Sequence, residues 1–158
     1  MNTMKRRTFL KGTLASGVVA AAAGAGLLRP AEVLAAEWPK SSAFHQRSVD
    51  TALTKLFGSS HVTDSSKIKI EAPIQAENGS VVRVSGETDM KVEAMAIIAA
   101  NNPSPLAASV KLSGGAKGYF RTHIKMGKTS DVHVVVKSGG KLYKATQKIK
   151  VTVGGCGG

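Results

Sequence analysis

The chain has 158 residues, of which 22 are Lys or Arg and 10 are Asp or Glu, so its formal net charge is +12, and it contains a single cysteine. One cysteine excludes an intramolecular disulfide framework, and the length fits one domain once a leader is removed. The basic residues are dispersed, with no arginine-rich block and no interleaved aromatic residues. That pattern argues against nucleic-acid binding and leaves solvated lysine faces or an anionic partner.

Residues 1–35 are expected to be a cleaved export signal of the twin-arginine (Tat) type. Arg6 and Arg7 precede an apolar, alanine-rich stretch at 14–28, and small residues lead to a cleavage site after Ala35. The alternative is a membrane anchor, but the apolar stretch is shorter than the roughly 20 residues that span a bilayer. The leader holds five Lys or Arg and one Glu, so its removal leaves 158 less 35, or 123 residues, with a charge of +8. We therefore expect a periplasmic protein with no membrane association after cleavage.

Residues 36–58 are expected to form an N-terminal segment that contains one amphipathic helix. Gly58 is a typical helix stop. The helix should pack its apolar face on the edge of the domain or on a partner. The apolar residues that recur at helical spacing are Val49, Ala52, Leu53 and Leu56.

Residues 59–153 show the alternation of apolar and polar residues that is typical of half-buried strands. The pattern predicts an all-β, immunoglobulin-like antiparallel β-sandwich of about seven strands. We expect Ile68, Ile70, Ala72 and Ile74 on one buried face, and Val92, Ala94, Ala96 and Ile98 pointing into the sandwich. The expected strands lie in the segments 67–74, 80–87, 91–100, 107–112, 118–126, 131–138 and 141–153.

Glycine and proline mark the expected connections. Asn78-Gly79 is a strong hairpin signal, and Gly139-Gly140 predicts a second tight turn. The two prolines of the segment 101–106 predict a loop, because proline cannot sit inside a central strand.

No catalytic or metal site is expected, and no cofactor. The chain has no phosphate-binding loop, no CxxC motif and no evident pair of acid/base carboxylates. Its histidines lie on different expected elements without metal-ligand spacing, although the three on the β-domain could still converge in space. The four histidines are His45, His61, His123 and His133.

The segment 154–158, GGCGG, is expected to be a flexible carrier arm. Glycine removes side-chain bulk and permits almost any backbone angle, so the thiol of Cys156 would sit on a thin thread. From Val153 to Cys156 an extended chain reaches about 10 Å. The segment has no neighbouring cation to stabilise a thiolate, so partner enzymes must supply the loading chemistry. The arm glycines are Gly154, Gly155, Gly157 and Gly158.

Two other interpretations of this segment compete with the carrier arm. A ubiquitin-like sulfur carrier would use its C-terminal glycine as a thiocarboxylate. The export signal opposes this interpretation, because ATP-dependent activation belongs to the cytoplasm, and the β-only pattern opposes it too. A structural secreted β-domain could carry an incidental thiol. An exposed thiol is, however, a liability in an oxidising compartment, where it oxidises and cross-links.

The sequence resembles the SoxY family, the sulfur-carrying subunits of the SoxYZ complexes of bacterial thiosulfate oxidation. The resemblance covers essentially the whole chain. It rests on the leader and on AENG (76–79), NPSPLAA (102–108), RTHIKMGKTSDV (121–132), GGKLY (139–143) and the terminal GGCGG (154–158).

This resemblance implies a sandwich that pairs with SoxZ and a Cys156 that holds the sulfur species covalently. It further implies that the haem protein SoxAX couples thiosulfate to the cysteine. The manganese hydrolase SoxB would then release sulfate, and SoxCD, where present, would oxidise the remaining sulfane sulfur. The chain itself would be a carrier and not an enzyme.

Overall fold

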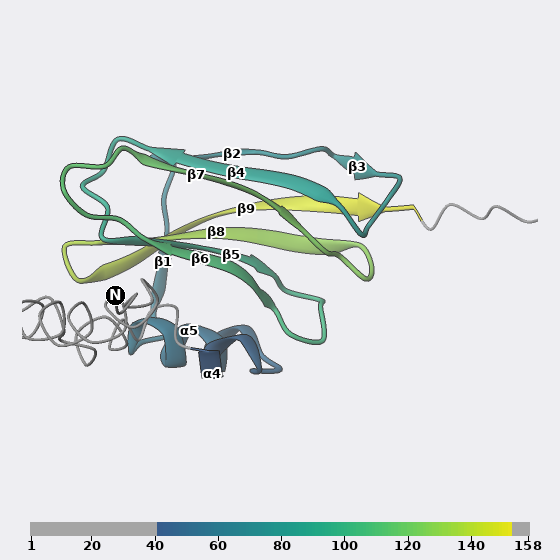
Figure 1. Ribbon diagram of the computed structural model, residues 1–158, viewed down its shortest axis with the longest axis horizontal. Coiled ribbons are helices and arrows are strands. Elements are labelled where there is room, and N and C mark those ends of the chain that lie inside the picture. The colour runs from purple at the N-terminus through teal and green to yellow at the C-terminus, as the bar shows by residue number, and fades with distance from the viewer. Residues whose placement is uncertain (1–40, 153–158) are drawn as a thin grey trace, which may run out of the picture. The chain divides into compact units, whose positions relative to one another are not determined.

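The computed structural model describes residues 41–152, which form nine strands and two short helices (Figure 1). The chain divides into two units, Met1–Glu37 and Trp38–Gly158, and the first, with the predicted leader, lies outside the described residues. No helix in the described range is long and apolar enough to cross a membrane. The elements are α4 (Ser41–Phe44), α5 (Val49–Phe57), β1 (Val62–Asp64), β2 (Ile68–Glu71), β3 (Gln75–Ala76), β4 (Val82–Thr88), β5 (Ala94–Ala99), β6 (Leu106–Lys111), β7 (Gly118–Ile124), β8 (Ser130–Ser138) and β9 (Lys141–Val151).

The strands form two layers, which confirms the predicted all-β sandwich. The larger sheet has the order β1-β9-β8-β5-β6, with β3 also paired to β9, and the smaller has the order β2-β4-β7. Pairing is antiparallel except that β1 and β3 run parallel to β9. The sequence did not predict these two strands, because elements of three and two residues are too short to show an alternating pattern.

The central strand β5 is buried on both faces. Met95 and Ile97 belong to the core between the two sheets, whereas Ala96 and Ile98 pack with the helices on the other face. The prediction that Ala96 and Ile98 point into the sandwich is therefore wrong. A strand that is covered on both faces has a continuous apolar sequence. Such a sequence does not show which side chains face the core between the sheets and which face the helices. Ile74, also predicted to be buried, is 76% exposed because it follows the end of β2.

Helix α5 confirms the predicted amphipathic helix and lies on the outer face of the larger sheet (Figure 1). Ser48 caps its first turn, with the Thr51 backbone N–H donating to Ser48 Oγ over 3.2 Å. Gly58 ends the helix in the left-handed region at φ 86°, where glycine is favoured. Its buried side chains, Ala52, Leu53 and Leu56, pack against a cluster from β5, β6, β8 and β9.

The two predicted glycine turns have opposite outcomes. Gly139 and Gly140 both adopt positive φ and join β8 to β9 as a two-residue hairpin, as predicted. The prediction of a hairpin at Asn78-Gly79 is wrong. The flanking strands β3 and β4 do not pair with each other, and Gly79 does not adopt positive φ. Glycine at this position serves a close backbone approach instead.

Candidate functional site

The long strand β9 leads directly to the segment that holds Cys156. Thr152 is the last described residue, so Cys156 and the four arm glycines lie outside the described range, as do Arg6 and Arg7. The backbone N–H of Thr152 donates to the carbonyl oxygen of Ala76 over 3.0 Å, and its hydroxyl donates to the same oxygen over 3.3 Å. The chain is thus held in place up to four residues before the cysteine.

Every backbone N–H from 150 to 152 has a partner outside β9. The N–H of Lys150 donates to the Ile74 carbonyl over 2.9 Å, beside the parallel pairing of β3 with β9. The N–H of Val151 donates to the hydroxyl of Thr129 over 3.0 Å. These bonds fix the position and direction of the backbone up to Thr152, the last described residue.

Gly79 lies against the end of β9 because it has no side chain. The backbone N–H of Met126 donates to the Gly79 carbonyl over 2.6 Å. A Cβ added to Gly79 would collide with the Met126 carbonyl oxygen and would lie 2.9 Å from Val151 Cγ1. Only glycine therefore allows the segment 77–81 to pack on both the 125–129 loop and the end of β9.

Two asparagines also hold the 125–129 loop, through side-chain hydrogen bonds. The Asn102 side chain donates to the Lys125 carbonyl over 2.7 Å and accepts from the Gly127 N–H over 3.1 Å. The Asn101 side chain donates to the Thr129 carbonyl over 3.0 Å, beside the hydroxyl that bonds β9. The loop is thereby positioned to present Thr129 to β9.

We call these residues the arm base: Ala76, Gly79, Asn102, Met126, Thr129 and Thr152. Three motifs that are distant in sequence, at 76–79, 102–108 and 121–132, meet here. From the sequence, Gly79 is expected in a hairpin, and neither Asn102 nor Thr129 has an expected role at the end of β9. Only the tertiary contacts bring the three together.

The arm end of the sandwich is positively charged. Four exposed lysines lie on the 125–129 loop and on the last residues of β9, whereas the exposed acidic residues nearby are two, Glu77 and Asp131. Such a charge balance attracts anions over about a Debye length, roughly 8 Å at physiological ionic strength. The lysines are Lys125, Lys128, Lys148 and Lys150.

Two cavities of the described sandwich lie at the end opposite the last residues of β9. A cavity of about 660 Å³ is lined by residues of 91–93, 111–116 and Gly139, next to the start of β9. The 11 residues of β9 extend about 36 Å. Covalent geometry limits the four residues from Thr152 to Cys156 to about 14 Å. The thiol therefore cannot reach this cavity.

The histidines are separated in the structure. His61 and His123 are exposed, on the segment before β1 and on β7, and within residues 41–152 no three His, Cys, Asp or Glu side chains are grouped to hold a metal. His133, on β8, is half-buried, and its Nδ1 lies 2.8 Å from the hydroxyl of Thr146. Burial, with a smaller contribution from Lys144, lowers the pKa of His133 below its usual value.

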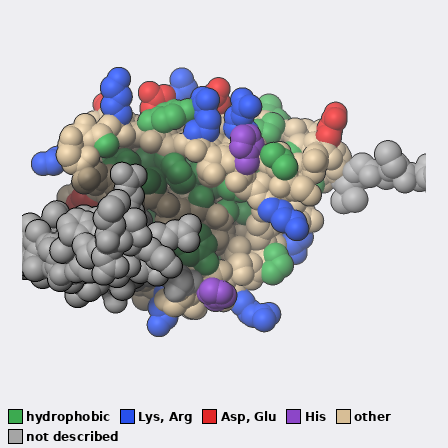
Figure 2. All heavy atoms as spheres, viewed as in Figure 1, with side chains coloured by type: hydrophobic (Ala, Val, Ile, Leu, Met, Phe, Trp, Pro, Cys, Tyr) green, Lys and Arg blue, Asp and Glu red, His purple; other side chains and the backbone are tan. Residues whose placement is uncertain are grey.

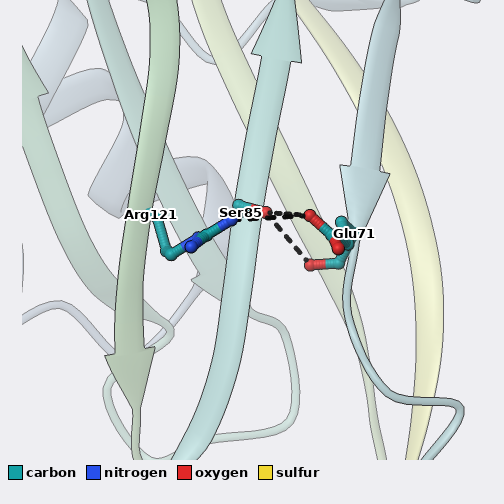
Figure 3. Close-up of polar contacts among 3 residues, drawn as sticks. All are labelled: Glu71, Ser85 and Arg121. Carbon is teal, nitrogen blue, oxygen red and sulfur yellow. Dashed lines mark hydrogen bonds and ion pairs between the residues drawn. The ribbon is translucent and has the colours of Figure 1, made fainter.

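The outer face of the smaller sheet carries a polar row, not a reactive site (Figure 3). The hydroxyl of Ser85 donates to the carboxylate of Glu71 over 3.3 Å, and Arg121 Nη2 lies 3.8 Å from the same Glu71 oxygen. The two charged side chains are 78% and 49% exposed, and such pairs contribute about 0–1 kcal/mol. This row stabilises β2, β4 and β7 locally.

Comparison with known proteins agrees with this geometry. The family model of the sulfur oxidation protein SoxY matches residues 53–156. The solved structure of the sulfur carrier protein SoxY from Chlorobium limicola f thiosulfatophilum is similar, with a TM-score of 0.61 and 36% identity. The similarity covers 70% of this chain and 96% of that chain. No curated protein matches. The chain belongs to the SoxY family of sulfur oxidation proteins.

Proposed function

We propose that this protein is a covalent carrier of sulfur intermediates in thiosulfate oxidation, with Cys156 as the attachment site. The observation that carries the proposal is the arm base, which holds the backbone in place through Thr152, four residues before the only cysteine. A fixed exit followed by glycines suits a thiol that must enter pockets of other proteins. Membership of the SoxY family supports the same function.

The proposed loading step forms a disulfide bond between the Cys156 sulfur and the sulfane sulfur of thiosulfate. The thiol loses its proton and the pair loses two electrons, which the haem protein SoxAX accepts. The product is a cysteine S-thiosulfonate with one negative charge. The manganese hydrolase SoxB then hydrolyses the bond between the sulfane sulfur and the sulfone, releasing sulfate and two protons and leaving a cysteine persulfide anion. Where SoxCD is present, it oxidises the remaining sulfane sulfur.

In this proposal the carrier supplies position and charge, and its partners supply catalysis. The lysines at the arm end favour the approach of anionic thiosulfate, and they help to hold the loaded, negatively charged arm near the carrier. The 660 Å³ cavity is too far from Thr152 for the Cys156 thiol to reach, which supports the proposal that catalysis takes place on partner proteins. We propose no resident cofactor and no metal.

The proposed setting is the periplasm, reached by twin-arginine export that depends on Arg6 and Arg7. Export in the folded state would allow the chain to leave the cytoplasm already bound to SoxZ. Replacement of both arginines by lysine should leave precursor in the cytoplasm. Unchanged export of that variant would eliminate the twin-arginine route.

The carrier role is tested by turnover in a system reconstituted with SoxZ, SoxAX and SoxB. Cys156→Ser should abolish thiosulfate-dependent electron transfer while the thermal midpoint and SoxZ binding are retained. As a matched variant that keeps the thiol, Gly155→Val with Gly157→Val adds β-branched bulk to the arm. It should alkylate normally with a small reagent yet lose turnover. Full activity of Cys156→Ser would refute the carrier function, and full activity of the valine variant would refute channel entry by a thin arm.

A further inference from the structure

The terminal strand of the larger sheet, β6, lacks the side chains that normally protect an edge strand. Within the described residues β6 pairs with β5 alone, and its sequence LAASVK has no charge or proline before Lys111. Natural edge strands are usually short, charged or interrupted by proline, because their unpaired N–H and C=O groups otherwise pair with other chains.

The other edges of the described sandwich have this protection. Strand β1 has only three residues, and β2 carries Lys69 and Glu71. Strand β7 carries Arg121 and His123, both exposed. Strand β6 has a register shift in its pairing with β5 between Ile97 and Ile98, but its lack of charged side chains before Lys111 distinguishes it from the other edges.

The side of the sandwich between β6 and β7 is also apolar. Ala107, Val110, Leu112 and Phe120 pack on the core between the sheets yet stay partly exposed. On the face drawn in Figure 2, hydrophobic side chains line a hollow between the two layers. Val110 pairs with Met95, so its side chain lies on the same inner face as that core residue. A partner strand at β6 would extend the sheet and cover this apolar side.

We infer that β6 is the docking edge for a second, different subunit, which adds an extended strand to the larger sheet. This mode, in which main-chain hydrogen bonds supply affinity, is a common way to bind a protein through an exposed edge. The inference rests on the proposed function, in which the carrier works with SoxZ, and it assigns that partnership to one surface.

Charge favours a neutral or acidic partner over a second copy of this chain. Residues 41–152 contain 16 Lys and Arg against 8 Asp and Glu, a net charge of +8. Two copies would bring like charges together, and like-charge juxtaposition opposes association. A neutral or acidic partner meets no such repulsion.

The position of β6 is compatible with a working arm. The strand begins four residues after Asn102 of the arm base, and it runs toward Lys111 and the far end of the sandwich, where the 660 Å³ cavity lies. A subunit paired along β6 would lie beside the sandwich and leave the exit of the arm open to enzymes.

Amide hydrogen exchange on the wild-type mature chain, alone and with SoxZ, tests the surface without any substitution. Peptides covering 106–112 should gain protection when SoxZ binds, and peptides covering the charged edge β2 at 68–71 should not. Protection at another edge with none at β6 would overturn the inference. Self-association of the chain through β6 in the absence of SoxZ would overturn the choice of a different subunit.

A pair of variants gives the second measurement. Val110→Lys places a charge at a half-buried position of β6, and Ile70→Lys does the same at β2, the control edge. Val110→Lys should weaken SoxZ binding more than tenfold, and Ile70→Lys should change it less than about twofold. Equal effects would overturn the inference. If either variant fails to fold, the exchange experiment alone decides. The adduct on Cys156 is measured separately. Failure of the β6 assignment would leave that adduct unchanged, whereas failure of the carrier function would abolish it.

Discussion

Gly79→Ala is expected to damage the arm base more than its size suggests. The added Cβ would collide with the Met126 carbonyl oxygen and would lie 2.9 Å from Val151 Cγ1, and real Cβ atoms do not come this close. The Met126 carbonyl oxygen is a backbone atom of the 125–129 loop, which also holds Thr129. The segment 77–81 must therefore move away from β9, and the loop or the end of the strand must shift with it.

The cost has two components. Overpacking of this kind costs about 1–3 kcal/mol. Displacement also weakens the hydrogen bond from Met126 N–H to Gly79, and a typical bond of this kind contributes about 0.5–1.5 kcal/mol. A loss of about 2 kcal/mol should lower the thermal midpoint of a domain of this size by about 8 °C. Turnover should fall as well, because the exit direction of the arm changes.

Gly127→Ala is the matched control, because Gly127 lies in the neighbouring loop and a Cβ there meets nothing within 4 Å. Its φ is not positive, so alanine is not strained, and its stability should change by less than about 0.5 kcal/mol. Thermal melts of the two variants and the wild type make the comparison. Equal melting of both variants would show that close approach at Gly79 does not hold the arm base together.

Three further predictions concern other parts of the fold. Asn102→Ala removes two hydrogen bonds to the 125–129 loop and should cost about 1–3 kcal/mol in urea unfolding; an unchanged midpoint would contradict the described contacts. Leu53→Ala leaves a cavity under α5 and should cost about 2–5 kcal/mol, whereas Lys55→Ala, exposed on the same helix, should stay within about 0.5 kcal/mol. Burial and Lys144 lower the pKa of His133 in the folded state, so the unfolded chain binds the proton more readily. The stability contribution is complete above the unfolded pKa of about 6.5 and is lost as the pH falls through the lower folded pKa. Melts at about pH 7.5 and pH 5 should show a larger loss for wild type than for His133→Gln, and equal losses would refute this assignment.

Much of the architecture follows from local sequence patterns. Apolar patterning predicts the seven longer strands, although β5 is buried on both faces and its pattern does not tell which residues face which layer. The paired positive-φ turn at Gly139-Gly140 follows from glycine chemistry alone. Helix α5 is predictable because its spacing and its Gly58 stop are both local signals.

The remaining features depend on contacts between distant segments. Strand β3 is two residues long and exists because β9 passes beside it. Asn78-Gly79 has the composition of a hairpin, yet the tertiary structure uses Gly79 for close packing on Met126. The hydroxyl of Thr129 meets the backbone of Val151 across 22 positions in sequence. No periodicity carries this information, so the arm base is recognisable only in the folded chain.

The most direct test of the carrier function is mass spectrometry of the intact mature protein and of its peptides, recovered during turnover with thiosulfate, SoxZ, SoxAX and SoxB, before and after reductant. The account predicts one thiosulfate-derived adduct per chain, on the peptide that contains Cys156. Reductant should remove it, because the linkage is a disulfide-type bond between two sulfur atoms. Sulfur on the C-terminal carboxylate, or a chain that turns over with Cys156 unmodified throughout, would contradict it.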